Sequence, residues 1–218
     1  MNPAKYELVI FDMDGTILNM LEDLADSLNH VLELFGYPVR TLDEVKSFVG
    51  NGLKKLIERA APEDVPEETR NQIYREHLKY YREHCADKTK PYDGIVSLIK
   101  NLRQHGKKTA VVSNKADAAV HDLCHQYFEG LFDAAVGERE SIAKKPAPDM
   151  VDAILETLAV PRDKAVYIGD SEVDIAMARN AGMDCVIVSW GFREKVFLRS
   201  QGADRIVDTA EELQFLLQ

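Results

Sequence analysis

A run of four apolar residues that ends on two aspartates constrains the fold of this chain more than any other feature. Leu8–Phe11 has no polar position, which is typical of a strand covered on both faces, as in a parallel sheet flanked by helices. Asp12 and Asp14 follow at once, with Gly15 after them. Because ligands bind beyond the carboxyl ends of such strands, the two carboxylates mark a candidate site.

The two aspartates have a second interpretation, which this stretch alone leaves open. Asp-Gly is a strong turn dipeptide and aspartate often bonds nearby backbone amides, so Asp12, Asp14 and Gly15 also fit a turn that ends the strand. Two carboxylates one residue apart repel each other unless a cation or a shared proton offsets their charge, which favours a site. The rest of the chain has to decide.

The composition excludes several classes of protein. The formal net charge of -10 would repel a nucleic acid or an anionic membrane surface, and no apolar run approaches the roughly 20 residues of a membrane span. The three cysteines are widely spaced and form no CxxC pair, so a disulfide framework is not expected. Residues 1–5 carry no apolar signal-peptide region. We therefore expect a cytoplasmic protein that binds neither nucleic acid nor membrane.

The periodicity of the chain predicts two regions of different architecture. Residues from about 19 to 90 show only helical spacing, with a capping-box signature at Thr41 and Glu44. From Pro91 onward, buried strands alternate with helices, and this alternation implies right-handed crossovers and a parallel sheet. The predicted fold class is α/β, with a parallel-sheet Rossmann-like core of residues 1–18 and 91–218. An all-helical cap of residues 19–90 is inserted after the first strand.

Polar residues follow three further strands or loops of the predicted core. Ser113 and Asn114 come directly after the strand at 108–112, Lys145 lies in a loop, and Asp170 and Asp174 follow the strand at 165–168. Taken singly, Ser113 would be a loop hydroxyl and Lys145 a solvated surface charge, and the two aspartates would cap a helix. Because the carboxyl ends of parallel strands share one edge, we expect them to meet Asp12 and Asp14.

The expected meeting of these groups predicts a type of chemistry. Up to four carboxylates in one place call for a hard divalent cation, and Mg²⁺ suits a site with few protein carboxylates and several water or phosphate oxygens. Ser113 and Lys145 are a hydroxyl and an ammonium that could hold the non-bridging oxygens of a phosphoryl group. Together the residues favour a phosphoryl site with Mg²⁺ as its cofactor.

In this order the segments resemble the four motifs of haloacid dehalogenase superfamily phosphatases. The motifs are residues 12–16, Ser113-Asn114, Lys145-Pro146 and residues 169–174, and they span the whole chain. The helical insertion resembles the first cap type of that superfamily. Val49-Gly50-Asn51-Gly52-Leu53, residues 145–149 and residues 188–191 are similar to the phosphoglycolate phosphatase branch.

The resemblance implies a role for each motif residue. Asp12 would be the nucleophile that forms an aspartyl-phosphate, and Asp14 would protonate the leaving oxygen and then deprotonate the attacking water. Mg²⁺ would bind the Asp12 carboxylate, the Asp14 backbone carbonyl and Asp170, while Asp174 would support these ligands without binding the ion. Lys145 would also restrain the charge on Asp12. The expected phosphate contacts are Asp12, Gly15, Thr16, Ser113, Asn114 and Lys145.

The resemblance also bounds the function. It implies Mg²⁺-dependent hydrolysis of a small phosphate monoester, with 2-phosphoglycolate as the first guess, by a monomer or a homodimer. A pyrophosphatase, a nucleotidase, a sugar-phosphate mutase and a non-catalytic phosphate-binding module stay open as alternatives. Many relatives carry an aspartate and a serine or threonine where this chain has Asn19-Met20. Because those positions lie at the predicted hinge, the departure concerns cap closure or substrate choice more than the reaction.

Overall fold

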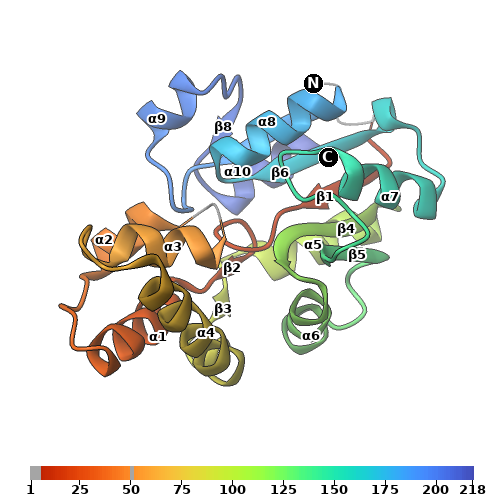
Figure 1. The fold of residues 1–218 in the computed structure, drawn as a ribbon. Helices are drawn as coiled ribbons and strands as arrows, with labels where there is room; N and C mark the ends of the chain where they lie inside the picture. The colour runs from red at the N-terminus through yellow and green to blue at the C-terminus, as the bar shows by residue number, and fades with distance from the viewer. Residues whose placement is uncertain (1–5, 50–51) are drawn as a thin grey trace. The chain divides into compact units, whose positions relative to one another are not determined.

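The chain forms two compact units in the computed structural model, which describes residues 6–49 and 52–218 (Figure 1). One unit comprises the described residues up to Leu18 together with Pro91–Gln218, and the other comprises those of Asn19–Lys90. Residues 1–5, Gly50 and Asn51 lie outside the described residues, so the predictions made for them stay predictions.

A six-stranded parallel sheet forms the centre of the first unit, as the sequence predicts. The strand order is β5-β4-β1-β6-β7-β8, and every described pairing within it is parallel. The strands are β1 Leu8–Phe11, β4 Lys108–Ala116, β5 Ala134–Glu138, β6 Ala165–Gly169, β7 Asp184–Val188 and β8 Ile206–Val207. The chain runs outward from β1 to β4 and β5 and then crosses back to β6. The loops after β1 and β6 therefore diverge at the switch point where such sheets bind ligands.

Helices cover the sheet and bury its apolar side chains. They are α5 Ile95–Gln104, α6 Asp117–Phe128, α7 Asp149–Leu158, α8 Glu172–Ala181, α9 Lys195–Ser200 and α10 Ala210–Leu217, with a 3-10 turn at Arg162–Lys164. On one face, Leu8 and Ile10 of β1 join a cluster with Met150 of α7 and Met177 of α8. Burial of each such side chain contributes about 1.5–3 kcal/mol. This packing fixes β1 rigidly beneath the candidate site.

The second unit is entirely helical in its described interior. Its helices are α1 Leu21–Leu34, α2 Leu42–Phe48, α3 Leu53–Ala60 and α4 Glu67–His84. The predicted capping box is present at the start of α2, where the Glu44 amide donates to the Thr41 hydroxyl and the Glu44 carboxylate accepts from the Thr41 amide. The short strands β2 Leu18–Asn19 and β3 Lys90–Pro91 pair where the chain passes between the two units.

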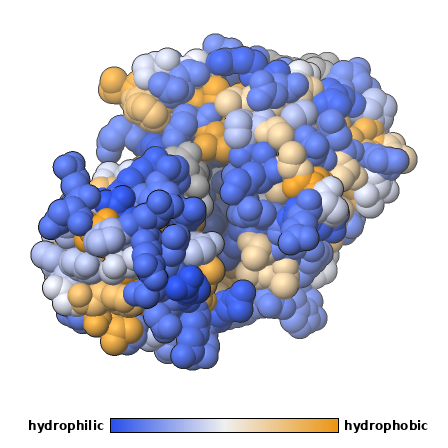
Figure 2. All heavy atoms as spheres, viewed as in Figure 1, coloured by the Kyte–Doolittle hydropathy of each residue, from blue (hydrophilic) through white to orange (hydrophobic). Residues whose placement is uncertain are grey.

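The surface is largely polar. Figure 2 shows a face covered mainly by hydrophilic residues, with apolar side chains in small separate groups. Such scattered groups are ordinary on protein surfaces. Among the described residues, every helix is too short or too polar to cross a membrane.

Candidate active site

The end of β1 brings Asp12 into the middle of the sheet edge. Phe11 pairs with Val111 of β4 on one side and with Ile168 of β6 on the other, and the Asp12 amide donates to the Ile168 carbonyl at 2.8 Å. The chain then turns at Gly15, whose φ of 86° favours glycine. A Cβ at Gly15 would lie 2.4 Å from Asp170 Oδ2, so the missing side chain lets this turn approach the loop after β6.

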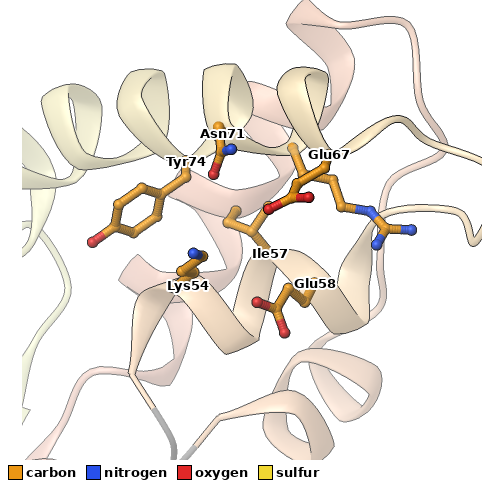
Figure 3. Close-up of a pocket in the computed structure, with 7 residues that line it drawn as sticks. Lys54, Ile57, Glu58, Glu67, Asn71 and Tyr74 are labelled. Atoms are coloured by element: carbon orange, nitrogen blue, oxygen red, sulfur yellow. The ribbon is translucent and has the colours of Figure 1, made fainter.

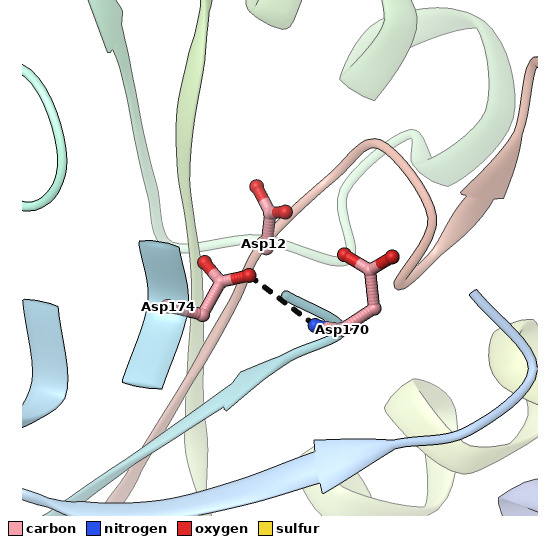
Figure 4. A group of neighbouring side chains, drawn as sticks. All are labelled: Asp12, Asp170 and Asp174. Carbon is pink, nitrogen blue, oxygen red and sulfur yellow. Dashed lines mark hydrogen bonds between the residues drawn. The ribbon is translucent and has the colours of Figure 1, made fainter. Parts of the chain in front are cut away.

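Three buried carboxylates meet at this edge (Figure 4). Asp12, Asp170 and Asp174 each offer an oxygen within 4.8 Å of the others. Asp174 lies in the first turn of α8, and its Oδ2 accepts from the Asp170 amide at 3.3 Å. These three aspartates therefore lie together, as the sequence predicts.

Lys145 is the cation of the cluster and is itself buried. Its Nζ lies 2.7 Å from Asp12 Oδ1 and 2.8 Å from Asp174 Oδ1, and it donates to the Tyr167 hydroxyl at 3.0 Å. An ammonium has three donors, and these three contacts engage all of them. Tyr167 in turn donates to Asp174 Oδ1 at 3.0 Å. The network holds Asp12 and Asp174 in fixed positions relative to β6.

The cluster carries more negative than positive charge. Burial, together with repulsion from Asp174, raises the pKa of Asp170 to about 7, and burial also raises the pKa of Asp12 well above its usual range despite Lys145. Burial opposes the charged form of Lys145, but Asp12 and Asp174 raise its pKa above the usual value. For Asp174, burial favours the neutral form, but the charge of Lys145 together with the hydrogen bonds from Lys145, Ser171 and Tyr167 outweighs burial and lowers the pKa. Three carboxylates around one ammonium leave a negative excess that a bound cation would neutralise.

The hydrogen bonds separate the carboxylates that could hold a metal ion from the one that could not. Both oxygens of Asp174 are occupied, Oδ1 by Lys145 and Tyr167 and Oδ2 by the Ser171 hydroxyl at 2.6 Å and the Ser171 amide at 3.1 Å. Asp12 and Asp170 are engaged at one oxygen each, by Lys145 and by the Phe192 amide at 2.8 Å. Their carboxylates are hard oxygen donors at a site of negative excess, which fits a hard divalent cation.

The chain matches the sequence profile of the haloacid dehalogenase-like hydrolases over residues 9–188. It belongs to that family. The phosphoglycolate phosphatase of Aquifex aeolicus is 32% identical over 96% of this chain and 96% of its own length, and that of Chromobacterium violaceum is 30% identical over 100% and 99%. A crystal structure from Lactobacillus delbrueckii subsp. bulgaricus, provisionally assigned as a phosphoglycolate phosphatase, superposes with a TM-score of 0.92 at 43% identity and covers 97% of this chain and 98% of its own.

Family and relatives together make this haloacid dehalogenase-like chain a hydrolase of phosphoric monoesters. The geometry above agrees with that class, because positioning and charge neutralisation supply most of the catalysis of phosphoryl transfer. Its buried Asp12, with Lys145 beside it, is the group that stands at the carboxyl end of the central strand.

The other residues predicted for the site lie outside this cluster of carboxylates and Lys145. Ser113 is buried on β4, whereas the strand was expected to end before it; β4 continues to Ala116, with an irregular register to β5 after Val112. Asn114 bonds the backbone of Lys145 twice, its Nδ2 donating to the carbonyl at 3.0 Å and its Oδ1 accepting from the amide at 2.8 Å. The Thr16 hydroxyl is buried and has no hydrogen-bond partner among the described residues.

Sequence reasoning missed two parts of the site. Tyr167 reads as one more apolar position of a buried strand, yet its hydroxyl joins Lys145 to Asp174. The loop after β7 supplies the Phe192 amide to Asp170, and a Cβ at Gly191 would lie 2.2 Å from Asp170 Oδ2. An aromatic hydroxyl inside a strand that leads into Gly-Asp could have indicated Tyr167. The Phe192 amide could not have been found in this way, because every residue except proline has a backbone amide.

The helical unit contains a small pocket of its own (Figure 3). It has a volume of about 170 Å³ and lies between α3 and α4, with Ile57 and Tyr74 among its lining. Its charged residues balance, because Lys54 and Arg70 stand with Glu58 and Glu67. With no excess of positive charge, the lining of this pocket does not favour a phosphate ester.

Proposed function

We propose that this phosphatase hydrolyses a small anionic phosphate monoester through a phosphoenzyme on Asp12, with Mg²⁺ as its metal ion and 2-phosphoglycolate as its substrate. The observation that carries the proposal is the buried contact of 2.7 Å between Asp12 Oδ1 and Lys145 Nζ, with Asp170 beside it at the switch point of the sheet. The names of the relatives from Aquifex aeolicus and Chromobacterium violaceum support the choice of substrate.

In the first step, a carboxylate oxygen of Asp12 attacks phosphorus. The bond from Asp12 to phosphorus forms as the bond from phosphorus to the leaving oxygen breaks, and Asp14 gives its proton to that oxygen. Lys145 holds Asp12 by a charge-assisted contact and offsets the negative charge of the incoming phosphoryl group. Ser113, which is buried on β4, donates its hydroxyl to a phosphoryl oxygen in this proposal.

In the second step, Asp14 takes a proton from water as the water oxygen bonds phosphorus and the bond to Asp12 breaks. This step regenerates the carboxylate of Asp12 and returns Asp14 to its acid form. We assign Asn114 to holding the Lys145 backbone rather than to binding phosphate, because both ends of its amide already bond that backbone.

The Asp12 and Asp170 carboxylates and the Asp14 backbone carbonyl would hold Mg²⁺, with Asp174 supporting them through Lys145 and Ser171. When bound, the ion neutralises the carboxylates and the charge of the phosphoryl group. Within this proposal, residues 19–90 serve as the cap that chooses the leaving group, and Asn19-Met20 lies where the chain enters it.

The proposal is tested with a panel of phosphate compounds, with and without a chelator. The panel holds 2-phosphoglycolate, a sugar phosphate, a nucleoside monophosphate and inorganic pyrophosphate. We expect the highest kcat/KM for 2-phosphoglycolate, loss of turnover on chelation and its return with Mg²⁺. Asp12→Asn should abolish turnover, and Asp204→Asn, which makes the same change at an exposed carboxylate, should leave it intact.

Three results would contradict parts of this proposal. Turnover in Asp12→Asn would reject the nucleophile, and turnover unaffected by chelation would reject the metal. A preference for pyrophosphate or a nucleotide would replace the substrate while leaving the mechanism in place.

A further inference from the structure

A second lysine, largely buried, lies at the same sheet edge. Lys115 belongs to β4, two residues beyond Ser113, in the segment where the register to β5 becomes irregular. Such irregularities re-aim side chains and are frequent beside active sites. Only 9% of its side chain is exposed. Lysine is rarely buried unless a charged partner accompanies it, so its partner is informative.

One charged partner of Lys115 is Asp14. The Lys115 Nζ lies 3.6 Å from Asp14 Oδ2, while Asp14 Oδ1 is buried and has no hydrogen-bond partner among the described residues. One oxygen of Asp14 is therefore held by a cation and the other is left for a ligand. The site thus has two lysine–aspartate pairs, with Lys145 on Asp12 and Lys115 on Asp14.

The backbone of Lys115 is fixed as well as its charge. Its amide donates to the Ser113 hydroxyl at 3.2 Å. On the neighbouring strand, a Cβ at Gly137 would lie 2.7 Å from the Lys115 carbonyl oxygen and 2.5 Å from the Cα of Asp117. The Gly137 amide donates to Asp117 Oδ1 at 2.8 Å, which ties the start of α6, directly after β4, to β5. Lys115 can therefore hold Asp14 against a rigid support.

We propose that Lys115 is a positioning residue that fixes the Asp14 carboxyl group for the proton transfer to the leaving oxygen. The inference rests on the proposed function, because it needs Asp14 as the acid of the first step. Restraint of one oxygen leaves the other in a single orientation, and a misplacement of about 1 Å at a reacting group can lower a rate about 100-fold. Without Lys115, Asp14 would rotate among orientations, of which only some reach the leaving oxygen.

The test compares two leaving groups in each variant. An alkyl ester such as 2-phosphoglycolate needs its leaving oxygen protonated, whereas p-nitrophenyl phosphate has a good leaving group that needs little help from an acid. Lys115→Met keeps most of the length of the side chain but removes its charge. We expect it to lower kcat/KM for 2-phosphoglycolate about 10- to 100-fold and for p-nitrophenyl phosphate less than about threefold.

Three further variants separate positioning from a structural role. Lys115→Arg keeps the charge and should recover kcat/KM to within about fivefold of wild type. Lys144→Met removes an exposed lysine paired with Glu138 and should leave both rates within about twofold. In an Asp14→Asn background, Lys115→Met should add less than about a further twofold, because a residue that acts through Asp14 has nothing left to position.

The ratio of the two rates is measured on one sample of each variant, so partial unfolding lowers both rates equally and leaves the ratio unchanged. An unchanged ratio in Lys115→Met, or a full additional loss in the Asp14→Asn background, would overturn the inference. If wild type hydrolyses neither ester, the proposed function itself fails. If wild type hydrolyses both esters and Lys115→Met has the same ratio of the two rates as wild type, the role of Lys115 is rejected and the proposed function stands.

Discussion

Replacing Asp170 with asparagine should stabilise the metal-free protein, although it removes a proposed metal ligand. Burial and the nearby Asp174 raise the pKa of Asp170 to about 7, from 3.8. Between these values the folded state keeps a proton that the unfolded state has released. The folded state then binds more protons, so the free energy of unfolding falls as pH rises from about 4 to about 7 and stays low above it. The asparagine of Asp170→Asn cannot ionise, so the variant does not show this fall in the free energy of unfolding.

The size of the effect follows from the same two values. A difference of about 3 in pKa corresponds to about 4 kcal/mol at about 1.4 kcal/mol for each unit. The asparagine oxygen can still accept from the Phe192 amide, so the loop after β7 keeps its contact. Near pH 8 the metal-free variant should therefore be more stable than wild type by up to about 4 kcal/mol, and the difference should vanish near pH 4.

Mg²⁺ should narrow this difference. An ion at 100 times its dissociation constant stabilises the protein that binds it by about 2.7 kcal/mol. Wild type should gain this at pH 8, and Asp170→Asn should gain little. Urea unfolding followed by tryptophan fluorescence is a suitable assay, because Trp190 is the single tryptophan and its indole donates to the Thr16 carbonyl at 3.0 Å beside the site. A stability difference independent of pH, or an equal gain from Mg²⁺ in both proteins, would refute the reasoning.

Three other substitutions have expected outcomes. Burial lowers the pKa of His77 to about 4, and neither ring nitrogen has a partner among the described residues. Because the unfolded state protonates this imidazole first, the stability of wild type relative to His77→Phe should fall by about 3 kcal/mol between pH 6.5 and 4 in far-UV dichroism melts, a difference in which the opposite contribution of Asp170 cancels. Gly191→Ala places a Cβ 2.2 Å from Asp170 Oδ2 and should abolish the Mg²⁺-induced rise in Tm. Asn114→Ala frees the Lys145 backbone and should lower kcat about tenfold in steady-state assays.

The sequence predicted the sheet because apolar runs and strand-to-helix alternation are local signals. Leu8–Phe11 has no polar position and is fully buried at the centre of the sheet. Once the strands are parallel, their carboxyl ends share one edge, which is why Asp12, Lys145 and Asp170 could be grouped before any distance was known.

The finer contacts of the site could not be predicted, because they depend on register and rotamers rather than on residue type. The two bonds of Asn114 to the Lys145 backbone could not be predicted from residue type, and β4 runs to Ala116 rather than ending before Ser113. The pairing of Lys115 with Asp14 joins residues 101 positions apart across an irregular register. No spacing rule connects them.

The central claim is that residues from separate segments meet around Asp12 so that this carboxylate takes up the phosphoryl group. The most direct test is a single turnover of 2-phosphoglycolate with Mg²⁺, quenched in acid within the first turnover and analysed by peptide mass spectrometry. The account predicts one added phosphoryl group on the peptide that contains Asp12, absent from Asp12→Asn. A phosphoryl group on any other residue, or none during active turnover, would contradict it.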